Sequence, residues 1–283
     1  MSEAPLTTTS PERVELESEG FANTGEHRRF AEFCDAVLRY RYIGVCVGAP
    51  GVGKTRSGRR YAQWELLEPL FPRYAYQDEL PSEIAGCQTV FYTPPTMNTP
   101  KLLTTQIQDR RMRLSWLVSV AMKASQRTAH KEILAGFEDR TKLLIVDEAQ
   151  RLKTRGFEHL RDMYDREGFG LVLIGMPGLE KELSRYPQLY SRVGFVHRYK
   201  ALEAGPTRRI IEAAPQLLGV SLSAEALTDD SIAAITRITG GNFRLIQRLM
   251  QQIELIMEAN EGLATVTPEV VNVAREGIVI GTG

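Results

Sequence analysis

Eight consecutive residues have the types and spacing of a phosphate-binding loop. They are Gly48, Ala49, Pro50, Gly51, Val52, Gly53, Lys54 and Thr55. Glycines let backbone N–H groups surround a phosphate without Cβ atoms in the way, and a helix that begins there adds the positive end of its dipole. In such a loop the lysine reaches the β- and γ-phosphates, and the threonine hydroxyl binds Mg²⁺. The motif predicts a bound triphosphate; the other interpretation is a glycine-rich turn with an incidental lysine.

Two acidic residues farther along the chain predict the rest of a hydrolytic site. The aliphatic residues 143–146 end in Asp147 and Glu148, which is a Walker B pattern. Asp147 is expected to hold Mg²⁺, and Glu148 is placed to polarise the attacking water. Alone, the two acids fit a solvated turn equally well. The P-loop upstream favours the catalytic interpretation, with Lys54 and Glu148 as catalytic residues.

The elements that must position these residues alternate between strands and helices. Strands are expected at residues 42–47, 88–93, 141–146, 170–175 and 193–199, with helices between them. The continuous aliphatic strands are typical of a parallel sheet covered by helices. We therefore expect an α/β fold with a five-stranded parallel sheet, followed by a small all-helical lid.

The predicted domain boundaries follow changes in composition. We expect a polar, flexible tail over residues 1–22, a nucleotide-binding core over 23–203 and the helical lid over 204–283. Asn23 with Glu26 predicts the cap of the first helix of the core. Two helices at about 101–111 and 114–123, and a third at 130–138, are expected before the acidic pair.

Composition excludes several classes of protein. The 283 residues carry 35 basic and 35 acidic side chains, so the net charge is zero, unlike that of a strongly basic nucleic-acid binder. The three cysteines have no metal-ligand spacing, which favours a reducing compartment. No apolar run approaches the ~20 residues that span a bilayer, and the N-terminus has no signal-peptide core. These features predict a cytoplasmic protein.

Together the motifs resemble the AAA+ ATPase superfamily. The resemblance rests on the P-loop, the Walker B run, the strand that ends at Gly175, and two later arginines, Arg192 and Arg244. It implies ATP and Mg²⁺ as ligands and ATP hydrolysis as the reaction. Arg244, in the lid sequence Gly-Gly-Asn-Phe-Arg, resembles the second sensor, which contacts the γ-phosphate. Arg192 resembles the arginine finger that acts on a neighbouring subunit, with Arg198 as second choice; an exposed helix-end arginine is the alternative.

One position departs from the superfamily pattern. The strand at 170–175 usually ends in a polar residue that helps to orient the water, whereas here Gly175 is followed by Met176. A thioether cannot donate a hydrogen bond. Either another residue supplies the polar group, or hydrolysis is slow, as in a switch or a scaffold.

Within the superfamily, residues 145–152 and 173–178 resemble the regulators of DNA transposition, the TnsC, TniB and phage Mu B proteins. The resemblance implies a homo-oligomeric ring or filament on duplex DNA, assembled with ATP, that recruits a transposase, and in some systems a target-selection protein, and dissolves on hydrolysis. DNA contacts are expected by region at Thr96, Lys101, Lys123 and Arg127, where an ordinary solvated face is the alternative. The same motifs occur in secretion-associated ATPases of the ExeA type, which act on protein complexes without nucleic acid.

Overall fold

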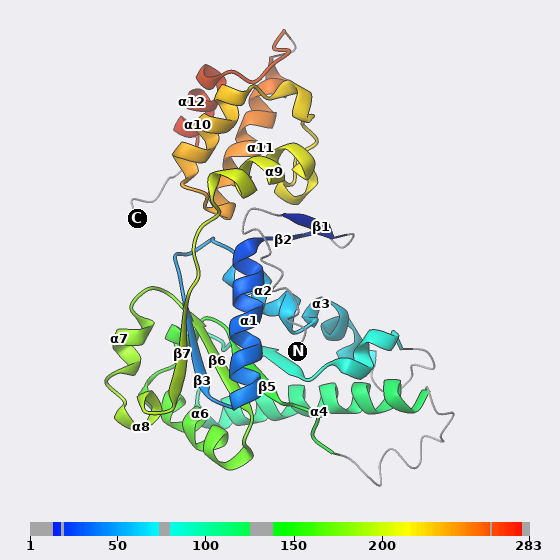
Figure 1. The fold of residues 1–283 in the computed structure, drawn as a ribbon, viewed down its shortest axis with the longest axis vertical. Helices are drawn as coiled ribbons and strands as arrows, with labels where there is room; N and C mark the ends of the chain where they lie inside the picture. Colours follow the sequence, from blue (N-terminus) through cyan, green and yellow to red (C-terminus); the bar gives the residue numbers. More distant parts are fainter. Residues whose placement is uncertain (1–13, 18–19, 74–79, 125–137, 261, 279–283) are drawn as a thin grey trace, which may run out of the picture. The chain divides into compact units, whose positions relative to one another are not determined.

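The computed structural model describes residues 14–17, 20–73, 80–124, 138–260 and 262–278. These residues form two compact units (Figure 1). The first, here called the sheet unit, comprises Phe30–Gly48 and Lys54–Tyr199. The second, the helical unit, comprises Met1–Arg29, Ala49–Gly53 and Lys200–Gly283.

The sheet unit is built on five parallel strands in the order β4-β5-β6-β3-β7. The strands are β3 (Ile43–Val47), β4 (Thr89–Tyr92), β5 (Leu143–Val146), β6 (Gly170–Gly175) and β7 (Val193–Arg198). Every residue of the first four is buried, as a parallel strand covered on both faces requires. β7 lies at the edge and alternates between half-buried and exposed residues. The predicted α/β fold is confirmed.

Helices flank this sheet, and short 3-10 turns join several of them. They are α1 (Gly25–Tyr40), α2 (Lys54–Tyr61), α3 (Trp64–Leu67), η1 (Glu68–Arg73), η2 (Ser82–Gly86), α4 (Pro100–Ala124), η3 (Ala149–Arg151), α6 (Thr154–Glu167), α7 (Leu179–Leu183) and α8 (Pro187–Tyr190). None of the helices in the described ranges is both long and apolar enough to cross a membrane.

The cap of the first long helix, α1, lies one residue later than predicted. Thr24 Oγ1 accepts a hydrogen bond from the His27 backbone N–H at 3.2 Å, so Thr24, rather than Asn23, caps the helix. Farther along, Phe33 stacks on His197 of β7 with ring centroids 5.5 Å apart. This packing holds α1 beside the edge of the sheet next to the P-loop strand.

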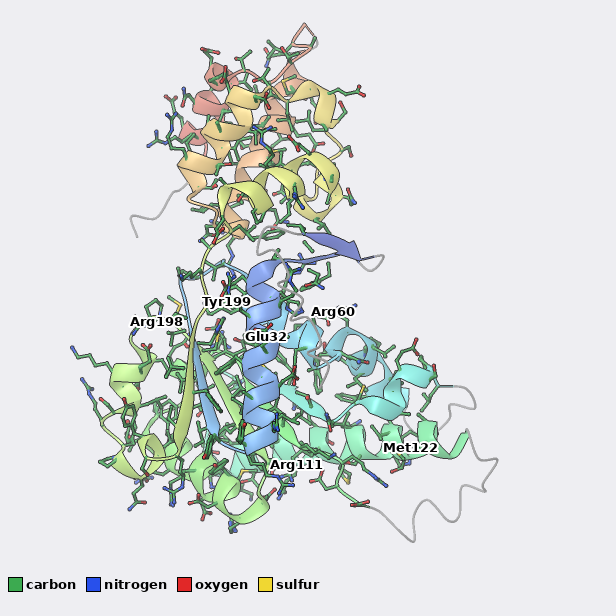
Figure 2. All side chains as sticks on the ribbon, in the orientation of Figure 1. Glu32, Arg60, Arg111, Met122, Arg198 and Tyr199 are labelled. Carbon is green, nitrogen blue, oxygen red and sulfur yellow. The ribbon has the colours of Figure 1, made fainter. Side chains whose placement is uncertain are left out.

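The predicted break between two helices at 111–114 is absent, because α4 runs without interruption for 25 residues. The sequence there has no glycine or proline, and Arg111 is anchored. It pairs with Asp139 and Glu167, and its guanidinium lies 5.0 Å from the centroid of the Phe169 ring. Figure 2 labels Arg111 and Met122 along this helix. Of the third expected helix, at 130–138, only Glu138 lies within the described residues.

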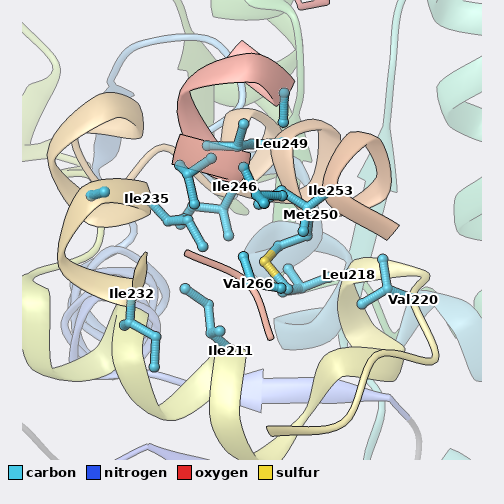
Figure 3. Close-up of a cluster of buried hydrophobic side chains, with 14 of the residues drawn as sticks. Ile211, Leu218, Val220, Ile232, Ile235, Ile246, Leu249, Met250, Ile253 and Val266 are labelled. Carbon is cyan, nitrogen blue, oxygen red and sulfur yellow. The ribbon is translucent and has the colours of Figure 1, made fainter. Parts of the chain in front are cut away.

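The helical unit has its own hydrophobic core (Figure 3). Its elements are α9 (Ala204–Ala213), η4 (Pro215–Leu218), η5 (Ala224–Ala226), α10 (Asp229–Thr239), α11 (Phe243–Ala259) and α12 (Pro268–Glu276). Ile211, Ile235, Leu249 and Ile253 are fully buried at its centre. These helices agree with the lid predicted from the sequence.

Part of the predicted flexible tail has regular structure. β1 (Glu15–Glu17) pairs antiparallel with β2 (Phe21–Asn23). Gly20 has φ +70°, which suits the turn between them. Val14 and Ala22 pack against the core of the helical unit, which the local polarity of this segment did not indicate. Residues 1–13 lie outside the described part of the chain.

Candidate nucleotide-hydrolysis site

The P-loop connects β3 to α2 with the backbone geometry that phosphate binding needs. Gly51 and Gly53 have φ of +82° and +113°, a region that side chains with a Cβ rarely adopt. Lys54 begins α2, and its Nζ donates to the Gly48 carbonyl at 2.7 Å. The loop therefore places the lysine ammonium beside its own backbone and at the N-terminus of a helix.

Tyr199 fixes the start of this loop. A Cβ on Gly48 would lie 2.4 Å from the Tyr199 carbonyl oxygen, so the two backbones can approach only because residue 48 is a glycine. The Tyr199 hydroxyl is 2.7 Å from Ser57 Oγ in α2. Figure 2 shows Tyr199 beside Arg198, at the carboxyl end of β7. No local pattern indicates this role, because Tyr199 is remote from the P-loop along the chain.

The two predicted metal ligands lie side by side. Thr55 Oγ1 donates to Asp147 Oδ2 at 2.8 Å, although 92 residues separate them in the chain. Asp147 is buried at the carboxyl end of β5, and its backbone N–H donates to the Tyr92 carbonyl. A hydroxyl and a carboxylate fit Mg²⁺, which takes oxygen ligands and usually keeps waters and substrate phosphates as the others. The described residues contain no richer cluster of metal-binding side chains.

Burial perturbs the Asp147 carboxyl. Loss of solvent raises the pKa of Asp147 above its ordinary value, and the hydrogen bond from Thr55 opposes that shift. A raised pKa in the folded state means that protonated Asp147 is favoured by folding, and that this contribution is lost as pH rises through the folded pKa. At neutral pH the buried carboxylate therefore destabilises the nucleotide-free protein, and a bound cation would relieve that cost.

We expect Asp147→Asn to raise the melting temperature of the nucleotide-free protein at pH 7.5 by about 2 to 4 °C, the effect of about 1 kcal/mol in a domain of this size. Asparagine keeps an acceptor for Thr55 and removes the buried charge. The difference should shrink as pH falls through the raised pKa of Asp147 and vanish below about 3.9, the ordinary pKa of an aspartate, where the carboxyl is protonated in both the folded and the unfolded state. Differential scanning fluorimetry checks this, with Glu158→Gln, at an exposed position of α6, as control. Lower stability of Asp147→Asn at pH 7.5 would contradict it.

Glu148, the predicted polarising residue, has a strained backbone. Its φ is 52° and ψ 41°, the left-handed region, which costs a residue with a Cβ about 1–2 kcal/mol. The turn brings its side chain back onto the 3-10 helix that follows. Glu148 Oε2 accepts a hydrogen bond from Gln150 Nε2 at 2.7 Å and lies 3.9 Å from Arg151 Nη2. Backbone strain of this kind is common at functional sites.

The same 3-10 helix holds the loop at residues 94–98. Arg151 Nη1 donates to the Pro94 carbonyl at 3.1 Å, and Asn98 Nδ2 donates to the Arg151 carbonyl at 3.1 Å. The loop after β4 is thus hydrogen-bonded to the turn that carries Glu148. Arg151 and Asn98 were not among the predicted site residues, and their pairing joins parts of the chain more than 50 residues apart.

Comparison with known proteins identifies the family of this chain. A family model described as the AAA domain matches residues 37–183, just over half of the chain. The chain belongs to the AAA family of ATPases. The match includes the P-loop, Asp147 and Glu148, and it establishes nucleotide binding and ATP hydrolysis as the chemistry of the fold.

Two curated proteins are similar to this AAA ATPase over most of its length. A protein of Staphylococcus aureus described as a potential ATP-binding protein is 40% identical over 275 residues, which cover 93% of this chain and 98% of that protein. The Mu-like prophage FluMu DNA transposition protein B of Haemophilus influenzae is 26% identical over 241 residues, covering 82% of this chain and 71% of that protein.

A solved structure supports the fold alone. The Aeropyrum pernix ORC1 protein in complex with DNA superposes with a TM-score of 0.55 at 18% identity. The match covers 89% of this chain but only 64% of the ORC1 chain. The AAA ATPase therefore shares its fold with that protein and spans about two thirds of the length of the ORC1 chain.

Within the helical unit, the segment that carries Arg244 contacts the tip of the P-loop. Asn242 Nδ2 donates to the Pro50 carbonyl at 2.8 Å, and the Arg244 backbone N–H donates to the Gly51 carbonyl at 3.1 Å. Gly241 has φ +73°, and a Cβ there would lie 1.8 Å from the Leu202 carbonyl oxygen. Arg244 itself is exposed. Its predicted contact with the γ-phosphate stays a prediction.

Arg192 lies at the opposite end of the sheet from its own P-loop. Its carbonyl accepts from the Ile43 N–H, at the start of β3, whereas the P-loop follows Val47 at the other end of that strand. Four strand residues separate the two ends by roughly 13 Å. Arg192 Nε donates to Asp165 Oδ1 at 2.5 Å. This placement argues against action on its own nucleotide.

The alternative finger, Arg198, ends β7 at the same edge as the P-loop. Its side chain is 81% exposed, and its closest ion-pair partner among the described residues is Glu180, at 3.8 Å.

Two of the predicted DNA contacts lie on the surface. Thr96, in the 94–98 loop, and Lys101, at the start of α4, are both exposed. The side chain of Lys123, and Arg127 altogether, lie outside the described residues.

Proposed function

We propose that this AAA ATPase is an ATP-dependent regulator of DNA transposition. With ATP bound it assembles as a homo-oligomer on duplex DNA, recruits and activates a transposase there, and disassembles on hydrolysis. The observation that carries the proposal is the 26% identity over 241 residues to the Mu-like prophage FluMu DNA transposition protein B. The exposed residues around the 94–98 loop provide a surface for DNA.

The proposed roles of the site residues follow from their positions. The loop 48–53 and Lys54 bind the phosphates, while Thr55 and Asp147 hold Mg²⁺. Bound Mg²⁺ would neutralise phosphate charge as it develops during transfer. Glu148, held in its turn beside Asp147, orients the attacking water and accepts its proton. Arg244 contacts the γ-phosphate from the helical unit.

Hydrolysis is proposed to depend on assembly. Arg192 is too far along the sheet to reach the phosphates above its own P-loop, so it would serve the nucleotide of a neighbouring subunit. In its ion pair with Asp165, the side chains of both residues are partly exposed to solvent. Such surface ion pairs stabilise a fold by about 0–1 kcal/mol. An arginine finger contributes about 10³–10⁵ in rate, or roughly 4–7 kcal/mol. The internal pair is therefore weak enough to be exchanged for a phosphate.

DNA and hydrolysis are connected through Arg151. Its side chain is bonded to the Pro94 carbonyl and lies near Glu148, and its carbonyl accepts from Asn98. A ligand that moves the 94–98 loop would therefore act on the turn that holds Glu148. This supports a switch in which DNA contact changes the rate of turnover.

Electron microscopy with duplex DNA tests the proposal. The full chain is imaged with and without DNA, in ATP, ADP and a non-hydrolysable ATP analogue. We expect rings or filaments on DNA with the analogue and their loss with ADP. Nucleotide-dependent assemblies that form equally well without DNA would favour the alternative, an ATPase that acts on protein complexes without nucleic acid. No assembly on DNA in any nucleotide state would refute DNA binding.

Lys101→Ala should weaken DNA binding and make it less salt-dependent. A contact to one phosphate contributes about 0.9 to the slope of log affinity against log salt concentration, whatever the DNA sequence. We expect the slope to fall by about one, measured by fluorescence anisotropy with the ATP analogue. Lys142→Ala is the matched control, since that exposed lysine precedes β5, at the other end of the strands. An unchanged slope in Lys101→Ala would remove Lys101 from the interface.

A further inference from the structure

Gln150 connects two parts of the catalytic edge of the sheet. Its Nε2 donates to Glu148 Oε2 at 2.7 Å. The left-handed backbone of Glu148 makes this contact possible, because it turns the chain into the 3-10 helix Ala149–Arg151. In an extended strand, side chains two residues apart lie on the same face about 7 Å from each other. The turn after β5 instead brings Glu148 and Gln150 within hydrogen-bond distance.

The other polar atom of Gln150 faces the end of the neighbouring strand β6. A Cβ on Gly175 would lie 3.0 Å from Gln150 Oε1, so this glycine leaves room for the carboxamide. Oε1 is buried and has no hydrogen-bond partner among the described residues. Buried acceptors in native proteins are nearly always paired with protein or ordered water. Oε1 is thus an unused acceptor at the end of β6, out of contact with solvent.

The end of β6 is also where the expected polar side chain is missing. Met176 follows Gly175, and its thioether cannot donate a hydrogen bond. β5 and β6 are neighbours in the sheet, so the turn after β5 can bring a carboxamide to the end of β6. The side chain of Gln150, in the 3-10 helix after β5, lies beside Gly175 at the end of β6.

We propose that Gln150 is a positioning residue for hydrolysis, which supplies the polar group that Met176 lacks. Its Nε2–H holds the Glu148 carboxylate in the orientation that accepts a proton from the attacking water, and its Oε1 packs beside Gly175 at the end of β6. The inference rests on the proposed role of Glu148. It implies that the methionine at the end of β6 does not by itself make the enzyme slow.

The test compares variants that keep the shape of residue 150. Gln150→Met loses the donor and the acceptor, and Gln150→Glu replaces the donor by a second carboxylate beside Glu148. We expect kcat for ATP to fall about 10- to 100-fold in Gln150→Met, the effect of one hydrogen bond to a charged group, and farther in Gln150→Glu. The dissociation constant for ATP should stay within about twofold. Gln108→Met, at an exposed position of α4, is the control.

A double variant separates positioning from a structural role. If Gln150 acts through Glu148, adding Gln150→Met to Glu148→Ala should lower single-turnover hydrolysis no further. The inference would be overturned if Gln150→Met lowered hydrolysis equally in the wild-type and Glu148→Ala proteins. It would also be overturned if Gln150→Met kept a kcat within about twofold of wild type, or if it lost ATP affinity in parallel with kcat. Normal turnover of Glu148→Ala alone would instead refute the role of Glu148, and the two failures are thereby distinguished.

Discussion

Glu148→Gln should lower ATP hydrolysis by about 10²–10⁴-fold, the range for loss of a general base, while ATP binding is kept. Glutamine retains an oxygen that can accept from Gln150 Nε2, so the turn after β5 should be preserved. Lys54, Thr55 and Asp147 are unchanged, and they are the side chains that hold the triphosphate and the metal. On the proposed function, assemblies on DNA should therefore persist in ATP as they do with the non-hydrolysable analogue.

The loss of hydrolysis is measured by phosphate release, and the retained affinity for ATP is measured by binding of a fluorescent ATP analogue. Glu158→Gln, at an exposed position of α6, is the matched control and should match wild type. Loss of ATP binding in Glu148→Gln would mean that Glu148, rather than Asp147 alone, serves the metal. Hydrolysis at the wild-type rate would show that another group activates the water.

Arg192→Ala should lower hydrolysis by about 10³–10⁵-fold in the assembled state and leave nucleotide binding intact. The reason is geometric, because Arg192 stands at the start of β7 and the P-loop stands at the end of β3. The lost pair with Asp165 is a surface ion pair, so the melting temperature should change little. Arg185→Ala, an exposed arginine in the preceding segment, is the control.

Mixed assemblies decide whether the arginine acts between subunits. A Glu148→Gln subunit has an intact Arg192, and an Arg192→Ala subunit has an intact Glu148. If Arg192 serves the neighbour, mixing the two inactive proteins should restore part of the hydrolysis. If it serves its own nucleotide, no mixture can be active. If Arg192→Ala hydrolyses ATP normally, whereas Arg198→Ala is inactive alone and regains hydrolysis when mixed with Glu148→Gln, the role belongs to Arg198.

The experiments on Glu148 and Arg192 concern residues that the sequence singles out by type and spacing. The residues that contact them in the fold cannot be read from the sequence. The P-loop and the Walker B run were recognisable because each is contiguous, and a local backbone conformation is largely set by local residue types. The lid helices were recognisable for a similar reason, since the spacing of their apolar residues is helical. The uninterrupted helix α4 was not predicted because Arg111, near its middle, forms ion pairs with Asp139 and Glu167, which are distant along the chain.

The hairpin of β1 and β2 was missed for the same kind of reason. Its sequence is polar, and Val14 and Ala22 find an apolar surface only on the core of the helical unit, which is formed by residues near the other end of the chain. Thr24 replaced Asn23 as the cap of α1, although asparagine is the better capping residue, because Asn23 is the last residue of β2 and pairs with Glu15. Sequence alone does not distinguish the two.

The sequence by itself determined that this chain has a parallel α/β sheet, and it predicted the P-loop, the aspartate after β5 as a metal ligand and the adjacent glutamate. These depend on residue types within a few positions of one another. Only the tertiary structure decided that Tyr199 fixes Gly48, that Gln150 reaches the end of β6, and that Arg192 lies across the sheet from its own P-loop. Those relations join strands that are distant along the chain, and the order and register of the sheet, rather than any local propensity, bring them together.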